Sequence, residues 1–219
     1  MSGVDAGEGG GGAAEAWLAA ADGLVAGVHH ALNNRLGTVS ALVQLASMDG
    51  GPGPEAVGAL REELERMVGT LRLLGMIPRR REEPIPLQLS ELLPDVLALV
   101  AQHRDARDVH FAVQTAADLL PVLCPESALV HALLALLAGA AVAATEAGTS
   151  RVDVRCTGDQ RRVTLEVEPE GDALGGSVGG PGLAALFAAA GGEVEATETG
   201  IVARLPTLLA GRAGPHPAA

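Results

Sequence analysis

Apolar positions repeat at helical spacing through the first third of the chain. From Ala14 to Met48 the spacing predicts one long helix, whose apolar or small positions are Leu18, Ala21, Val25, Val28, Leu32, Val39 and Leu42. The break DGGPGP, residues 49–54, interrupts the pattern. The spacing then resumes in a second helix, over residues 54–77, at Val57, Leu60, Leu64, Met67, Leu71 and Leu74. Two amphipathic helices joined by a short turn predict an antiparallel hairpin.

The apolar stripe of this hairpin is longer than one hairpin can bury. Two copies of it would form a four-helix bundle, which hides both stripes from water. The pattern therefore predicts a homodimer built on the helical hairpin.

The pattern changes after the charged, proline-punctuated segment 78–86. Helical spacing is expected over 89–103, 128–145 and 183–190. Alternating apolar and polar residues predict strands at 109–115, 151–157, 161–169, 192–197 and 200–206. The strand at 151–157 is expected to pair with the one at 161–169, and the strand at 192–197 with the one at 200–206. These elements predict a mixed sheet covered by helices on one face, so the whole chain belongs to the α+β class.

Composition changes mark the expected domain limits. We expect a disordered Gly-rich tail over 1–13, a helical-hairpin domain over 14–83, an α/β domain over 84–210 and a second disordered tail over 211–219. The N-terminal segment lacks the basic and apolar regions of a secretory signal. The apolar run 128–145 contains His131 and has acidic flanks, which favours a core helix over a membrane span.

Charge and cysteine usage exclude several classes of function. The formal net charge is -12, and the dense basic run at residues 79–81 is followed at once by Glu82 and Glu83, which argues against nucleic-acid binding. Cys124 and Cys156 are far apart and lack the spacing of metal ligands, so we expect buried thiols and no metal site. Free thiols fit a reducing, cytoplasmic location.

One histidine lies on the expected outer face of the first helix. The heptad pattern puts His30 opposite the apolar stripe, with Asn34 one turn later on the same face and Asn33 beside it. An exposed neutral imidazole can act as a nucleophile, and a nearby amide can orient a phosphoryl group or a water. The alternative is a surface histidine without chemistry. His29 flanks the stripe and is expected to pack.

The segment His30 to Leu36, HALNNRL, closely resembles the phosphoacceptor box of bacterial two-component sensor histidine kinases. That family has a dimeric helical hairpin carrying this histidine, followed by an ATP-binding α/β domain. Two positions depart from the family pattern. Ala31 stands where the kinases carry the acid that assists self-phosphorylation, and Arg35 stands at a place often held by proline.

The second half resembles the ATP-binding domain of the same family with its site degraded. In CPESALVHALLALLAGAAVAAT, the family's two asparagines are replaced by Ala135 and Gly139, which have no side-chain oxygen for magnesium or phosphate. Pro169 stands where the family's adenine-binding aspartate would be. The resemblance therefore implies a degenerate ATPase-type α/β sandwich without a bound cofactor.

The resemblance implies a histidine phosphotransferase that shuttles a phosphoryl group through His30 between receiver-domain aspartates, with magnesium supplied by the receiver. Its partners would be response-regulator receivers or a hybrid histidine kinase, and its docking residues are expected to be Gly37, Ala41, Arg61, Leu64 and Glu65. One alternative is a pseudokinase adaptor that docks such partners without carrying phosphate, and that stimulates receiver dephosphorylation through Asn34. Another is a divergent but active kinase.

Overall fold

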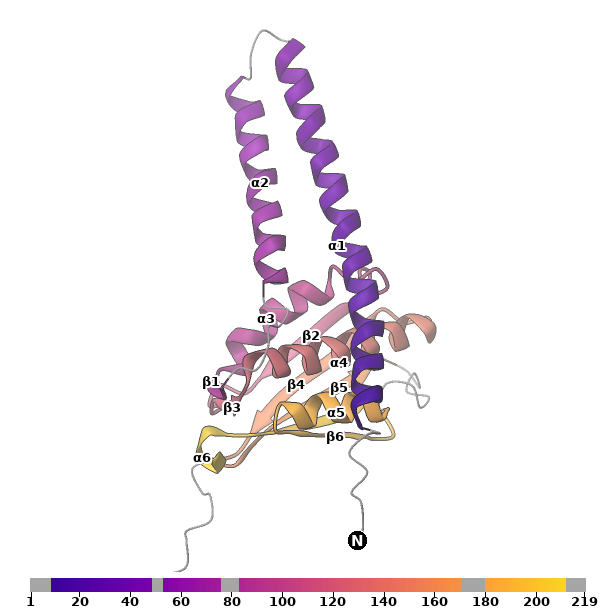
Figure 1. Cartoon of the computed structure of the whole chain (residues 1–219), viewed down its shortest axis with the longest axis vertical. Helices are drawn as coiled ribbons and strands as arrows, with labels where there is room; N and C mark the ends of the chain where they lie inside the picture. Colours follow the sequence, from indigo (N-terminus) through magenta and orange to yellow (C-terminus); the bar gives the residue numbers. More distant parts are fainter. Residues whose placement is uncertain (1–8, 49–52, 76–82, 171–179, 212–219) are drawn as a thin grey trace, which may run out of the picture.

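Two long antiparallel helices rise from an α/β layer (Figure 1). The computed structural model describes residues 9–48, 53–75, 83–170 and 180–211. The helices are α1 (Gly9–Met48), α2 (Pro54–Leu74), α3 (Leu89–Val100), α4 (Glu126–Glu146), α5 (Pro181–Ala189) and α6 (Leu208–Gly211). The strands are β1 (Ile85–Leu87), β2 (His110–Thr115), β3 (Val122–Cys124), β4 (Arg151–Gly158), β5 (Arg162–Pro169), β6 (Glu193–Ala196) and β7 (Ile201–Pro206).

The mixed sheet follows the alternation seen in the sequence. Its strand order is β2-β4-β5-β7-β6, with β2 and β4 parallel and the other pairs antiparallel. Every second residue of β5 is buried, including Val163, Leu165 and Val167, because a strand sends alternate side chains to opposite faces. The buried face packs under α4 and α5. The expected α+β class, with a helical hairpin followed by a mixed sheet and helices, is confirmed.

Helix α4 is the centre of the core. Its leucines and alanines are apolar on all sides, as expected of a helix surrounded by other elements, and Leu129, Leu133 and Leu137 are fully buried. Among the described helices, α4 is the one long and apolar enough to cross a membrane, but 67% of its most apolar window is buried inside the structure. The helix therefore packs as a core element here.

Helix α1 belongs to both parts of the fold. Its C-terminal half packs beside α2, and its N-terminal half lies against α4 and α5 (Figure 1). Leu24 and Val28 are buried in the same hydrophobic cluster as α4, whereas Leu18 and Val25, expected on the apolar stripe, are 65% and 61% exposed. Helix α1 also begins at Gly9, within the segment expected to be a disordered tail.

A short two-stranded sheet joins the beginning of the α/β domain to the segment before α4. Strand β1 overlaps the end of the charged, proline-punctuated segment 78–86 and pairs antiparallel with β3, so that Ile85 lies opposite Cys124. The sequence pattern missed both strands, since each has only three residues and Pro86 interrupts β1. The segment 76–82, which holds the basic run and Ile77, lies outside the described residues.

A cluster of charged side chains connects the two hairpin helices, α1 and α2. Glu63 of α2 is buried and accepts two hydrogen bonds from Arg66, at 2.9 and 2.6 Å, while Arg35 of α1 lies 3.8 Å away. One terminal nitrogen of Arg35, Nη1, is buried without a hydrogen-bond partner. Arg35 thus depends on Glu63 for its counter-charge.

Replacing Glu63 by alanine is expected to destabilise the protein by about 2 kcal/mol, because the partly buried guanidinium of Arg35 then loses its counter-charge. Urea denaturation of the variant measures this loss. The exposed Glu62, whose carboxylate is 3.8 Å from Arg66, gives the matched control: Glu62→Ala is expected to change stability by less than about 0.5 kcal/mol. Equal losses in the two variants would contradict this account.

Candidate functional site

His30 lies exposed on α1, on a stretch of regular helix that sets its spacing to Asn34. The Asn34 side-chain amide donates a hydrogen bond to His30 Nε2 at 3.0 Å. Residues four apart on a helix lie one turn apart on the same face, so the contact follows directly from the spacing. The structure therefore brings together two of the three residues expected to carry the chemistry.

The contact fits the neutral tautomer of the imidazole whose ring proton is on Nδ1, in which Nε2 accepts from Asn34 and keeps its lone pair. A neutral ring with a free lone pair at an exposed nitrogen is the nucleophilic form of histidine. Attack through Nε2 would require Asn34 to release the nitrogen, after which its amide could donate to an oxygen of the incoming group.

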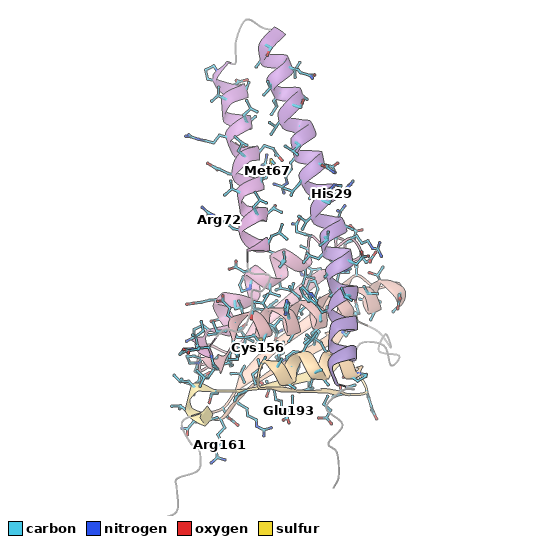
Figure 2. The ribbon with its side chains drawn as sticks, viewed as in Figure 1. His29, Met67, Arg72, Cys156, Arg161 and Glu193 are labelled. Carbon is cyan, nitrogen blue, oxygen red and sulfur yellow. The ribbon has the colours of Figure 1, made fainter. Side chains whose placement is uncertain are left out.

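The third expected residue, Asn33, is paired with the other histidine. Its amide donates to His29 Nε2 at 3.1 Å, so Asn33 faces His29 rather than His30. Figure 2 shows His29 on the side of α1 that points away from α2. His29 lies seven residues before the exposed Leu36 on the same face of the helix. The two histidines are therefore on different faces, each with its own asparagine.

The residues expected to dock a partner fall into two groups. Gly37 and Ala41 are exposed on α1, and a Cβ added at Gly37 would have no atom within 4 Å. Arg61, Leu64 and Glu65 are on α2, where they line an open groove with Val68 and Arg72. Figure 2 shows Arg72 on the outer side of α2. The structure thus leaves the turn after His30 open to a closely approaching surface.

The degraded nucleotide positions lie in the α/β layer. Ala135 packs partly buried against the core cluster, Gly139 is on the same helix, and Pro169 is buried at the end of β5. One turn before Ala135, the ring of His131 contacts the ring of Trp17 on α1 in a tilted arrangement, with ring centroids 3.8 Å apart. The N-terminal half of α1 therefore covers the beginning of the α4 face that holds Ala135.

A close backbone contact holds α1 on this domain, and the sequence pattern did not reveal it. Gly23 lies against the His103 ring, and a Cβ at Gly27 would fall 1.6 Å from the carbonyl oxygen of Gln102. The Arg104 amide donates to the Gly23 carbonyl at 3.2 Å, and the Arg107 guanidinium donates to the Gly27 carbonyl at 3.3 Å. The segment 101–109, which we call the docking loop, therefore meets α1 one turn before His30.

Burial shifts the pKa values of two histidines beside α1 and of two cysteines in the sheet strands. Burial lowers the pKa of His131 to about 4, and burial also lowers the pKa of His103, which Asp105 partly opposes. Burial raises the pKa of Cys124 to about 12, and that of Cys156 to about 11. Both cysteines are free, buried thiols, so they are inert at neutral pH. The titrating histidines both lie where α1 meets the domain.

The low pKa of His131 predicts acid-sensitive packing of α1. The unfolded chain binds a proton near pH 6.5 and the folded chain only near pH 4, so this contribution to stability is complete above pH 6.5 and is lost as the pH falls toward 4. We expect a loss of about 1 kcal/mol between pH 7.5 and 5.5 that His131→Gln lacks. Urea denaturation at both pH values tests this, and equal pH slopes would contradict it.

Comparisons with known proteins find likeness only among solved structures. No model of a known protein family matches the sequence, and no curated protein matches it. The histidine kinase AdeS of Acinetobacter baumannii is 13% identical, with a TM-score of 0.40 over 82% of this chain and 98% of that chain. A bacterial phosphotransferase is 18% identical, with a TM-score of 0.42 over 86% of this chain and 96% of that chain.

A third similar structure is the histidine kinase ThkA in complex with the response regulator protein TrrA. It is 19% identical, with a TM-score of 0.43 over 84% of this chain and 60% of that chain. Histidine kinases are also the family that the segment His30 to Leu36 resembles.

Proposed function

We propose that the protein is a histidine phosphotransferase of a two-component phosphorelay. It would accept a phosphoryl group on His30 from the phosphorylated aspartate of one receiver domain and pass it to the aspartate of another. The observation that carries the proposal is the exposed His30 imidazole, whose Nε2 lies 3.0 Å from the side-chain amide nitrogen of Asn34.

The transfer balances without a nucleotide. His30 Nε2 forms the bond to phosphorus as the bond between phosphorus and the receiver aspartate breaks, and the aspartate leaves as a carboxylate. The proton on Nδ1 then passes to water, which leaves a neutral phosphorylated ring. The receiver's magnesium site stabilises the charge that develops on the phosphoryl oxygens. Asn34, displaced from Nε2, is placed to donate to one of these oxygens.

The α/β domain supports an ATP-independent role. Ala135 and Gly139 have no side-chain oxygen to hold magnesium or phosphate, and Pro169 has no carboxylate for an adenine amino group. The ring of Trp17 on His131 further covers the helix that carries the first two positions. Ala31 lacks the acid that the kinase resemblance requires for self-phosphorylation.

The hairpin carries an apolar face that fits a second copy of the chain. Exposed apolar residues form one row on α1, at Leu18, Val25, Leu36 and Val43, and one row on α2, at Val57, Leu64, Val68 and Leu71. Leu36 and Leu64 each follow, by one residue, the ion pair of Arg35 and Glu63 that joins the two helices. A rotation of 100° per residue in antiparallel helices brings both rows to the same side of the hairpin. This face is the proposed seam of a homodimeric four-helix bundle, so Leu64 is assigned to the seam and not to the docking of a receiver.

Labelled phosphate from a panel of phosphorylated receiver domains tests the proposal. We expect label on the wild-type protein and on His29→Ala, and none on His30→Ala, in the absence of ATP. His29→Ala is the matched control because it removes a neighbouring exposed histidine that has its own asparagine. Failure of every receiver to label the wild-type protein would overturn the proposal.

The contact of Asn34 with His30 also favours a second function, that of an adaptor with phosphatase activity. The same amide could orient a water toward a docked phospho-receiver without any transfer to His30. In that case, the protein would speed receiver dephosphorylation, Asn34→Ala would abolish the effect, and His30→Ala would retain it. Transfer to His30 distinguishes the two functions.

A further inference from the structure

The docking loop brings a cation to the turn of α1 that precedes His30. The Arg107 guanidinium donates to the carbonyl of Gly27 at 3.3 Å, and His30 is three residues further along the same helix. Residues three apart are neighbours on a helix surface, roughly 5–6 Å between Cβ atoms. Helical side chains also lean toward the N-terminus, so the His30 side chain lies over the turn that Arg107 contacts.

Arg107 differs from its neighbour Arg104 in its electrostatic state. The side chain of Arg104 forms an ion pair with Asp105 at 3.1 Å. Within the described residues, no carboxylate lies within 4.0 Å of the charged nitrogens of Arg107, and its side chain is exposed. Arg107 therefore places a guanidinium without an ion-pair partner among the described residues beside the histidine face, although it comes from a different part of the chain.

We propose that Arg107 is a phosphoryl-binding residue of the phosphotransfer site, and that its guanidinium contacts the phosphoryl group when that group is on His30. This inference rests on the proposed function of His30. A phosphorylated histidine carries close to two negative charges near neutral pH, and a guanidinium is well suited to pair with phosphoryl oxygens. The remaining guanidinium N–H groups of Arg107 can donate to the phosphoryl oxygens while the docking loop stays against Gly27.

The proposal gives the α/β domain a part in the chemistry. The docking loop follows α3 and leads into β2, so its position depends on the domain as a whole. The tight approach of Gly23 and Gly27 to this loop fixes the distance between the loop and the histidine face. A hairpin without the α/β domain would keep His30 and Asn34 but would lack the guanidinium of Arg107.

Phosphorylation of the protein with phosphoramidate, a small chemical donor, tests the proposal without any receiver. Phosphorus NMR follows the ionisation of the phosphoryl group with pH, and His30→Ala identifies the His30 signal. Arg107→Gln removes the charge but keeps a donor for the Gly27 carbonyl. We expect it to raise the pKa of the phosphoryl group by about half a unit, the effect of one adjacent charge in water after screening by salt.

Two further variants separate charge from structure. Arg107→Lys keeps a cation and is expected to restore most of the shift. Arg104→Ala removes a paired arginine from the same loop and is expected to leave the phosphoryl pKa unchanged. Identical titrations of the wild-type protein and Arg107→Gln would overturn the role of Arg107, whatever the outcome of the transfer assay.

Transfer from a labelled receiver then gives the second readout. In Arg107→Gln, we expect the equilibrium to move about threefold toward the receiver, which is the same half unit expressed as a ratio. A wild-type protein that takes phosphate from phosphoramidate, but from no receiver, would refute the proposed function and leave the Arg107 contact standing. Normal transfer from a receiver with no effect of Arg107→Gln would support the proposed function and refute the role of Arg107.

Discussion

A dimer that dissociates is the expected result of replacing Leu36 by glutamate. Leu36 is 52% exposed in the single chain and lies in the apolar row on α1. A twofold dimer buries one Leu36 from each protomer, and each buried leucine contributes about 2 kcal/mol. Loss of both contributions should raise the dissociation constant about a thousandfold or more. Leu64→Glu, in the row on α2, is expected to act in the same way. Analytical ultracentrifugation measures both.

Leu45→Glu is the matched control for this prediction. Leu45 is on the same helix and is 59% exposed, but nine residues of helix place it half a turn away from Leu36. We expect it to leave the dimer intact. A wild-type protein that is monomeric at micromolar concentration, or a Leu45→Glu variant that dissociates as readily as Leu36→Glu, would contradict the proposed seam.

The second large effect is expected at Gly27. An alanine there would place its Cβ 1.6 Å from the carbonyl oxygen of Gln102, and because that atom is backbone, it cannot move aside cheaply. We expect Gly27→Ala to destabilise the protein by about 3 kcal/mol and to loosen the N-terminal half of α1 from the domain. Urea denaturation gives the first quantity, and protection of α1 amides from hydrogen exchange gives the second.

Gly37→Ala, on the same helix, is expected to change the free energy of unfolding in the opposite direction. No atom lies within 4 Å of the added Cβ, so the variant only gains helix propensity, and stability should rise by about 0.5–1 kcal/mol. Destabilisation of similar size at both glycines would mean that the loss at Gly27 does not come from its contact with the docking loop, because Gly37 has no such contact.

Local patterns predicted most of the elements. The strand alternation of RRVTLEVEP and the helical spacing of residues 54–77 each depend on near neighbours, and the structure places β5 and α2 there. The i, i+4 relation likewise sufficed for the contact of Asn34 with His30. The same rule could have shown that Asn33 lies four residues after His29, since their hydrogen bond follows that spacing.

Contacts between distant segments could not be predicted in this way. The approach of Gly27 to Gln102 joins residues far apart in the sequence, and a glycine within a helical pattern does not by itself indicate which segment packs against it. The tilted ring contact of Trp17 with His131 and the pairing of β1 with β3 also join distant segments. The contact of Arg107 with Gly27 likewise depends on the packing of α1 against the domain, which local sequence patterns do not predict.

The central claim is that His30 carries a phosphoryl group between receivers without ATP. The most direct measurement loads the protein from one labelled phospho-receiver, removes that receiver, and adds a second, unlabelled receiver with no nucleotide present. We predict an alkali-stable label on the wild-type protein, absent from His30→Ala, that then moves to the aspartate of the second receiver. Label that never leaves the first receiver, or that is lost only as free phosphate, would contradict this claim.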